Sequence, residues 1–315
     1  MKKILYFDTS SGVSGDMFVG ALVDAGADIE VIRKHIASLG LEGFCVRARK
    51  VSKHGLMGTK FDVLDPHTGK DVDAPAEINN AHEHEHDHEH DHVHKHDHTH
   101  DHGHGHGHGH DHDHGHSHGN RHQHDHAVNH NHQHHRGLWE IGSIICQSGL
   151  PQQVKDDAVA VFKLLAVAEA KVHGTTLEEV HFHEVGALDC IVDIVSAASA
   201  FHQLKIDETW CSPIHVGSGT VRCAHGILPV PAPATMELLQ GVPIYSTEVK
   251  GELVTPTGAA LIRHFSRGFA PMPQMVVERV GYGAGSKDFG IPNLLRATIG
   301  KMVETALPEP LAQKP

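Results

Sequence analysis

The sequence has 315 residues, 36 histidines and a formal net charge of −13 at pH 7. Between His82 and His135 lie 26 histidines and ten acidic residues but only two basic ones, so this tract carries −8 of the charge and leaves −5 on the rest. No basic face is expected on such a chain, and no nucleic-acid partner is predicted. The N-terminus lacks a signal-peptide core, and no apolar run approaches the roughly 18 residues of a membrane span, so we expect a cytoplasmic protein without a membrane partner. Five scattered cysteines without a CxxC pattern argue against a disulfide framework.

Hydrophobic patterns predict a strand, two helices and a hairpin in the first 64 residues. An apolar strand at 3–7 runs into the loop 8–16. Helical spacing of apolar residues follows at 17–26 and again at 29–40, each ending in glycine. The alternation over 44–64, with His-Gly in its middle, predicts two strands and a turn.

The second half of the sequence predicts helices first and then mostly strands. A long helix is expected over 152–174, and a Thr-x-x-Glu pattern from Thr175 predicts a short one directly after it. Another helix is expected over 186–205. Beyond Trp210 we predict strands and turns with short helices at ATMELLQG and TGAALIRHF, and two strands around a glycine-rich turn over 276–302.

These elements predict a mixed α/β or α+β fold in which one globular body is interrupted by a long insert. The expected boundaries are 1–78 for the first part of the body, 79–135 for a disordered histidine-rich insert, 136–302 for the rest of the body and 303–315 for a flexible tail.

The histidine tract predicts binding of divalent metal ions. Imidazole suits Ni(II), Cu(II), Zn(II) and Co(II), and an H-x-H spacing lets neighbouring rings chelate one ion on an extended chain. The tract does not select among these metals, and a metal buffer or a solvated spacer stays an alternative. The candidate ligands in it are His84, His86, His88, His90, His92, His104, His106 and His108.

The stretch HFHEVGALDCIVD at 181–193 is a second candidate site. His181 and His183 share one face of an extended segment, and Asp189 and Asp193 are four residues apart on the following helix, away from its apolar stripe. Imidazoles and carboxylates so close together fit a metal or acid–base site. The alternative is that Asp189 simply favours the first turn of the helix.

The loop DTSSGVSGDM is a candidate anion site because hydroxyls, glycines and backbone N–H groups precede a helix. It matches neither a Walker A loop nor GxGxxG, and the alternative is a tight turn with Asp16 capping the helix. Weaker candidates in the C-terminal half are His225, Glu252, Thr255, Thr257, and the stretch GYGAGSKDFG with Lys287 and Asp288, which is equally a glycine-rich hairpin.

Taken together, several motifs resemble the LarC family of nickel insertion proteins. They are GVSGDM, an internal histidine-rich loop, HFHEVGALDCIVDIV, HGILPVPAPAT, GELVTPTGAAL and GYGAGSKDFGIPNLLR, in that order from Met1 to about Ile299. The resemblance implies a nickel insertase of the lyase or chelatase class. It would place nickel in pyridinium-3,5-bisthiocarboxylic acid mononucleotide to form the nickel-pincer nucleotide cofactor.

The resemblance also implies cofactors, partners and site residues. Insertion in the family depends on CTP with a divalent metal, which we expect to bind a C-terminal partner or fused segment lacking from this chain. The acceptor is expected to be an enzyme of the lactate racemase type, and the protein a homo-oligomer. His181, His183 and Glu184 would transfer nickel, with Asp189 or Glu184 as the base.

A substrate phosphate would then lie on the loop carrying Ser11, Ser14, Gly15 and Asp16. The alternative functions are a nickel storage protein or metallochaperone without insertion chemistry, and a protein of zinc trafficking.

Overall fold

The computed structural model describes residues 1–72, 136–180, 182, 188–223 and 225–303, and it confirms the mixed α/β class. The predicted insert at 79–135 and the tail from 304 lie outside the described residues. None of the helices in the described ranges is both long enough and apolar enough to cross a membrane.

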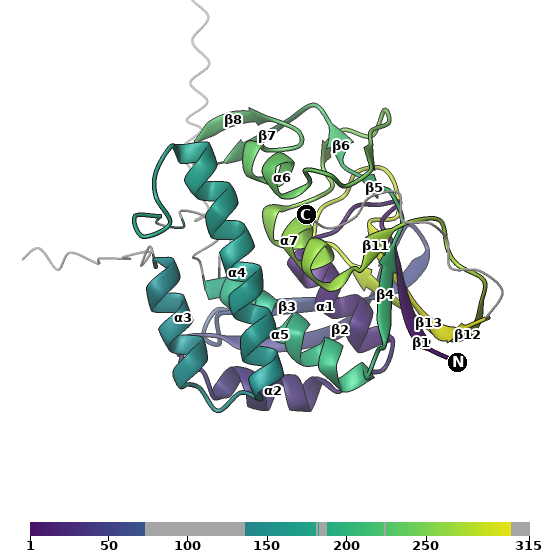
Figure 1. Ribbon diagram of the computed structural model, residues 1–315, viewed down its shortest axis with the longest axis horizontal. Coiled ribbons are helices and arrows are strands. Elements are labelled where there is room, and N and C mark those ends of the chain that lie inside the picture. The colour runs from purple at the N-terminus through teal and green to yellow at the C-terminus, as the bar shows by residue number, and fades with distance from the viewer. Residues whose placement is uncertain (73–135, 181, 183–187, 224, 304–315) are drawn as a thin grey trace, which may run out of the picture. The chain divides into compact units, whose positions relative to one another are not determined.

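A mixed sheet forms the framework of the described chain. Its seven strands are β1 (Lys3–Asp8), β2 (Cys45–Lys53), β3 (Leu56–Leu64), β4 (Glu208–Cys211), β11 (Gly268–Phe269), β12 (Met275–Ala284) and β13 (Leu294–Met302). They lie in the order β11-β4-β1-β13-β12-β3-β2 (Figure 1). Strands β4 and β11 run parallel to β1, whereas β13 is antiparallel to both β1 and β12.

Three small strand pairs stand apart from this sheet. Strand β5 (Ile214–His215) pairs with β9 (Ile244–Tyr245), β6 (Gly217–Ser218) with β10 (Gly251–Glu252), and β7 (Thr220–Cys223) with β8 (Gly226–Pro229). They account for the strand-and-turn character predicted beyond Trp210.

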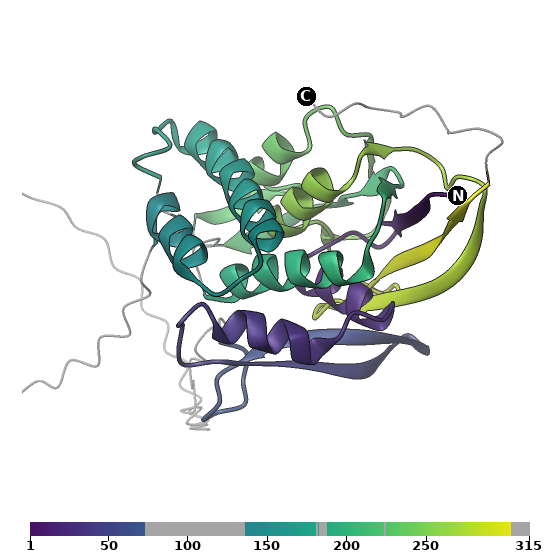
Figure 2. The ribbon, with the colours of Figure 1, turned by 60° about the horizontal axis from the view of Figure 1, so that its bottom comes forward.

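The helices pack against the sheet and against one another. They are α1 (Gly15–Asp24), α2 (Ile29–Ala37), α3 (Leu138–Gln147), α4 (Gln152–His173), α5 (Leu188–Leu204), α6 (Pro233–Leu238) and α7 (Pro256–Phe265). Helix α1 lies directly on β12 and β3, α5 packs on α1, and α4 packs on α5 and α7 (Figures 1 and 2). The long helix α4 ends at Gly174, whose φ of 64° is the left-handed cap expected of glycine.

The predicted helices and hairpins are found with one exception. His54 and Gly55 have φ of 50° and 83°, as the tight turn predicted between β2 and β3 requires. The short helix predicted after Thr175 is wrong, because residues 177–179 form a turn. There the Thr175 hydroxyl donates to the carboxylate of Glu179, 3.1 Å away, so the threonine closes a turn and starts no helix.

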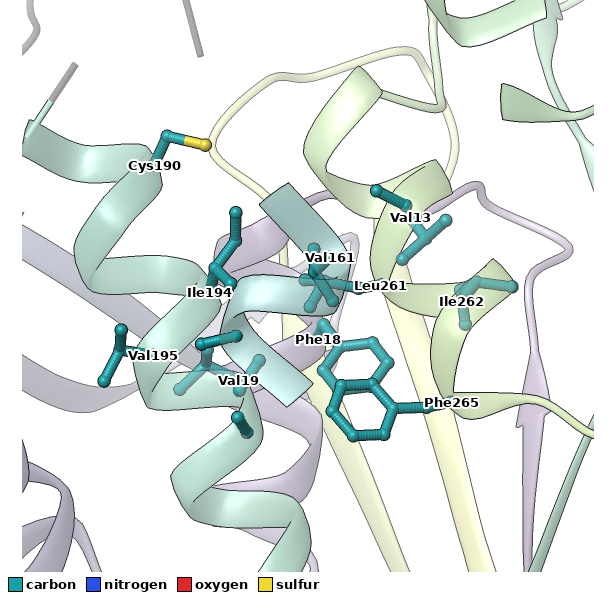
Figure 3. Packing of buried hydrophobic residues seen from close by; sticks show 14 of the residues in the cluster. Val13, Phe18, Val19, Val161, Cys190, Ile194, Val195, Leu261, Ile262 and Phe265 are labelled. Atoms are coloured by element: carbon teal, nitrogen blue, oxygen red, sulfur yellow. The ribbon is translucent and has the colours of Figure 1, made fainter. Parts of the chain in front are cut away.

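The largest buried cluster lies where α1, α5 and α7 meet. Phe18 packs against Phe265 with ring centroids 5.6 Å apart, and Leu261 and Ile194 are fully buried beside them (Figure 3). Cys190, at the start of α5, lies at the edge of this cluster. The apolar packing fixes how the first turns of these helices are placed relative to one another.

Two glycines of β12 let α1 approach the sheet closely. A Cβ atom on Gly283 would collide with the carbonyl oxygen of Met17, and one on Gly281 with that of Ala21. The glycines of GYGAG at these positions therefore serve helix packing, which supports the structural alternative for this stretch. Their consequence for function is indirect, since they set the position of the N-terminus of α1.

Candidate functional site

A cavity of about 260 Å³ brings together motifs that lie far apart in the sequence. Its wall comes from the start of α1, the middle of β3, the first turns of α5, the segment before α7 and the loop between β12 and β13. The polar residues of the lining are Ser14, Asp16, Lys60, Asp71, Asp189, Asp193, Glu252, Thr255, Thr257, Ser286, Lys287 and Asn293. Because five carboxyl groups face two lysines, we name it the acidic cavity.

The loop before α1 is joined to the segment before α7 by backbone hydrogen bonds. The Val13 N–H donates to the Leu253 carbonyl at 2.9 Å, and the Thr255 N–H donates to the Val13 carbonyl at 3.2 Å. Gly258 permits this approach, since a Cβ there would collide with Val13. The two candidate anion loops of the sequence therefore form one continuous wall.

Asp16 is tied to α1 and to a buried lysine. Its carboxylate accepts from the Met17 N–H at 2.8 Å, from the Ser14 hydroxyl, and from Lys60 Nζ at 2.5 Å. Asp16 therefore bonds within the first turn of α1, whereas the N-cap residue is Ser14, which makes no side-chain capping hydrogen bond.

Lys60 is the central cation of the acidic cavity. It is only 6% exposed, and its ammonium also donates to the Phe61 carbonyl at 2.8 Å and lies 3.8 Å from Asp62. Burial by itself lowers the pKa of Lys60, but the charges of Asp16, Asp193 and Asp62 outweigh that effect and raise the pKa above its usual value. Lys60 is therefore held as a cation inside the protein.

Asp193 is a buried carboxyl with unsatisfied hydrogen-bonding capacity. It is 5% exposed, and its Oδ1 has no hydrogen-bond partner among the described residues. Its other oxygen lies against Gly15, where any Cβ atom would collide with it. Burial raises the pKa of Asp193 well above its usual range, the carboxylates of Asp189 and Asp16 raise it further, and Lys60 only partly opposes them.

The opposite wall carries a second unsatisfied group. Asn293 is 3% exposed and donates from Nδ2 to the Lys287 carbonyl at 3.1 Å, while its Oδ1 has no partner among the described residues. The ammonium of Lys287 lies 3.5 Å from the carboxylate of Glu252. Within the cavity, then, oxygen atoms that could accept a proton or bind a cation are more numerous than cations that satisfy them.

The structure brings several predicted site residues together. Ser14, Gly15, Asp16 and Asp189 all line the acidic cavity, and Asp193 shares the face of α5 with Asp189 as the four-residue spacing predicted. Ser11 is not part of that lining.

Other candidates are engaged elsewhere. Asp8 pairs with Arg296 on the neighbouring strand β13, and Asp288 lies 3.0 Å from His54 in the β2–β3 turn. The roles assigned to Ser11, Ser14, Gly15 and Asp16 as phosphate contacts stay predictions, and the surrounding carboxylates favour a cation over a phosphate at that place.

The predicted metal ligands cannot be placed. His181, His183 and Glu184 lie outside the described residues, as do all candidate histidines of the tract. In the described part of the chain, no group of three or more His, Cys, Asp or Glu side chains is arranged to hold a metal ion.

Sequence reasoning missed Lys60, Asp71 and Asn293. The only sequence signal for Lys60 is that it and Asp62 alternate within the otherwise apolar run of β3, on one face of a buried strand. Asp71 and Asn293 sit in irregular segments whose spacing predicts nothing about a site, and only tertiary contacts bring them to the cavity.

The fold and cavity define an α/β protein with an acidic cavity that holds a buried lysine and a buried carboxyl group. The sequence profile described as "Nickel insertion protein" matches residues 5–313. The chain belongs to this family.

Curated relatives agree with this assignment. The chain is 43% identical over 304 residues to a pyridinium-3,5-bisthiocarboxylic acid mononucleotide nickel insertion protein of Desulfitobacterium hafniense, covering 96% of this chain and 59% of the relative. It is 40% identical over 300 residues to a protein of the same name from Geobacillus kaustophilus, covering 95% and 60%. A putative nickel insertion protein of Maridesulfovibrio salexigens is 47% identical over 300 residues, covering 95% and 63%. The chain thus spans about three fifths of the length of these relatives, and no solved structure matches it.

Proposed function

We propose that this chain binds Ni(II) and inserts it into pyridinium-3,5-bisthiocarboxylic acid mononucleotide, acting as a nickel insertase of the lyase or chelatase class. The observation that carries the proposal is the acidic cavity with a buried oxygen of Asp193 that has no hydrogen-bond partner among the described residues. The names of the relatives support the choice of metal and substrate.

The acidic cavity is suited to attract a divalent cation. Five carboxyl groups against two lysines give its lining a negative potential, which raises the local concentration of cations. Arrival of Ni(II) would favour the ionised form of Asp193 and displace its proton. Ni(II) is the cargo here and leaves with the product.

The ligands that hand nickel over are proposed to be His181, His183 and Glu184. They precede Asp189 in the sequence by five to eight positions, and Asp189 lies in the cavity wall. The histidine tract would serve as a loading arm that concentrates nickel before this transfer, because imidazoles bind the ion without enclosing it.

Insertion requires one proton to leave the pyridinium ring. The ring C–H bond breaks, its electron pair forms the carbon–nickel bond, nickel stays divalent, and the proton passes to a carboxylate. We assign that carboxylate to Asp189, with Glu184 as the alternative. A storage protein or metallochaperone would need metal ligands but no buried carboxyl beside a fixed lysine, so the acidic cavity supports insertion over storage.

The remaining partners follow from the family resemblance and belong to the same proposal. CTP with a divalent metal would act through a second part or partner, the product would pass to an acceptor enzyme of the lactate racemase type, and the chain would work as a cytoplasmic homo-oligomer.

The test is nickel insertion by the Asp189→Asn variant. The full chain, together with the proposed CTP-binding part or partner, is incubated with the mononucleotide, excess Ni(II) and magnesium CTP, and the nickel-containing nucleotide is measured by mass spectrometry. Loss of a general base lowers rates by about 10²- to 10⁴-fold, so we expect a fall of at least 10²-fold. The matched control is Asp156→Asn, an exposed helical aspartate on α4, which should keep the wild-type rate. A wild-type rate in Asp189→Asn would remove Asp189 from the mechanism, and no product from the wild-type chain would refute insertion by it.

A further inference from the structure

A second cavity of about 460 Å³ adjoins the acidic one. It is formed by the last turns of α4, the β7–β8 hairpin and the start of α6, and Glu252 and Lys287 line both cavities. We define this second cavity by His173, Arg222, Cys223 and His225, which do not line the acidic cavity.

The charges of the second cavity differ from those of the first. Glu169 lies 3.3 Å from His173, and Glu252 lies 3.5 Å from Lys287, so each carboxylate of the lining has a basic neighbour. The rings of His173 and His225 are 4.9 Å apart between centroids. Arg222 makes no ion pair or side-chain hydrogen bond within the described ranges, which leaves its guanidinium available to an anion.

The shape of this lining suits a phosphate group. Arginine presents a planar fork of N–H donors that matches two phosphate oxygens at once. Val221, Leu228 and Ala234 line the same cavity, and Arg222 is itself exposed, so a phosphate can reach its guanidinium from the solvent. A free guanidinium at this place also disfavours a metal cation.

The ring and the phosphate of the proposed substrate need binding places of different charge. Its ring has to meet nickel among the carboxylates of the acidic cavity, where a phosphate dianion would be repelled. Through Glu252 and Lys287 the second cavity gives the other end of the molecule a less negative place, where Arg222 and Lys287 balance the two carboxylates. Glu252 at this junction can accept hydrogen bonds from ribose hydroxyls.

We propose that the second cavity binds the phosphate of the mononucleotide, with Arg222 as its main contact, while the reacting ring lies in the acidic cavity. This inference rests on the proposed function, because it takes the substrate from it.

Binding of the mononucleotide and of its dephosphorylated nucleoside, each without nickel, tests the proposal by isothermal titration calorimetry on the full chain. Arg222→Ala should weaken mononucleotide binding about tenfold, equivalent to about 1.4 kcal/mol, and leave nucleoside binding unchanged. Arg222→Lys keeps the charge without the fork and should lie between wild type and Arg222→Ala. The matched control is Lys34→Ala, which removes an exposed cation on α2 outside both cavities and should bind like wild type.

Two results would overturn the phosphate site. One is equal mononucleotide affinity for wild type and Arg222→Ala, and the other is an equal loss of affinity for nucleotide and nucleoside. Should Arg222→Ala fail to fold, the comparison between nucleotide and nucleoside in Arg222→Lys decides. The two proposals fail separately: a wild-type chain that binds the mononucleotide but makes no nickel product refutes insertion alone, whereas normal insertion with unchanged binding by Arg222→Ala refutes the phosphate site alone.

Discussion

The two adjoining cavities share a wall but have opposite chemistry. In the acidic cavity, carboxyl groups outnumber lysines and one carboxyl is buried without a full set of partners. In the second cavity Glu169 and Glu252 each have a basic neighbour, and Arg222 makes no ion pair with any residue that the structure describes. On the two proposals above, this difference lets one chain hold a divalent cation and a phosphate close together without letting them pair with each other. The Glu252–Lys287 pair marks the boundary between them.

Lys60→Met is expected to destabilise the acidic cavity and to leave the residues of the second cavity unchanged. It leaves the buried Asp193 and the partly buried Asp16 without their cation, and removing one partner from a buried ion pair costs about 3–5 kcal/mol of unfolding free energy. Urea denaturation measures this loss. The matched control is Lys301→Met on β13, whose exposed pair with Glu278 at 3.0 Å should cost no more than about 1 kcal/mol. Similar losses in the two variants would show that Lys60 is not an internal counter-ion.

Gly15→Ala is expected to disturb the acidic cavity by sterics alone. The added methyl group would occupy the position of the Asp193 carboxylate, and overpacking of this kind costs about 1–3 kcal/mol. Thermal unfolding reports the lower stability. The difference in affinity between the mononucleotide and its nucleoside reports the phosphate contact, which should not change. Gly142→Ala in α3 is the control, since nothing lies within 4 Å of its added Cβ and alanine favours a helix. A Gly15→Ala protein as stable as Gly142→Ala would contradict the close packing against Asp193.

The smallest expected effect concerns the dependence of stability on pH. Because the pKa of Asp193 is raised in the folded protein, the folded state holds its proton more tightly than the unfolded chain does. Its contribution to stability is therefore fully present below the unfolded pKa of about 4 and is lost as the pH rises through the folded pKa.

Asp193→Asn removes this loss. Relative to wild type, the free energy of unfolding of the variant should rise by roughly 1.4 kcal/mol for each pH unit between the unfolded and the folded pKa of Asp193. Urea denaturation at a series of pH values measures this difference. For the Asp156→Asn variant, changed at an exposed position, the curve of unfolding free energy against pH should run parallel to that of wild type. Parallel curves for Asp193→Asn as well would mean that Asp193 is ionised in the folded protein.

Local sequence signals predicted most of the secondary structure. The His-Gly turn between β2 and β3 and the glycine that ends α4 follow from backbone conformations that few other residues adopt easily. The prediction from Thr175 was wrong because its side chain finds a local partner in a turn, an alternative that a four-residue pattern does not exclude.

The candidate site was predictable only where its members are neighbours in the sequence. Asp189 and Asp193 are one helical turn apart, so their common face follows from helix geometry. Asp16 and Lys60 lie 44 positions apart and meet only because α1 packs on β3. The same limit applied to Asp8, whose pairing with Arg296 depends on the register between β1 and β13.

The sequence by itself determined the class of fold and the family resemblance, because composition, periodicity and motif order are local properties of the chain; metal binding by the histidine tract stays a prediction from it. Only the tertiary structure decided that the acidic residues surround Lys60, that the glycines of β12 serve α1, and that Arg222 lies in a separate cavity without an ion pair to any described residue. Those facts depend on distances between residues remote in the sequence, and packing of the whole core sets such distances.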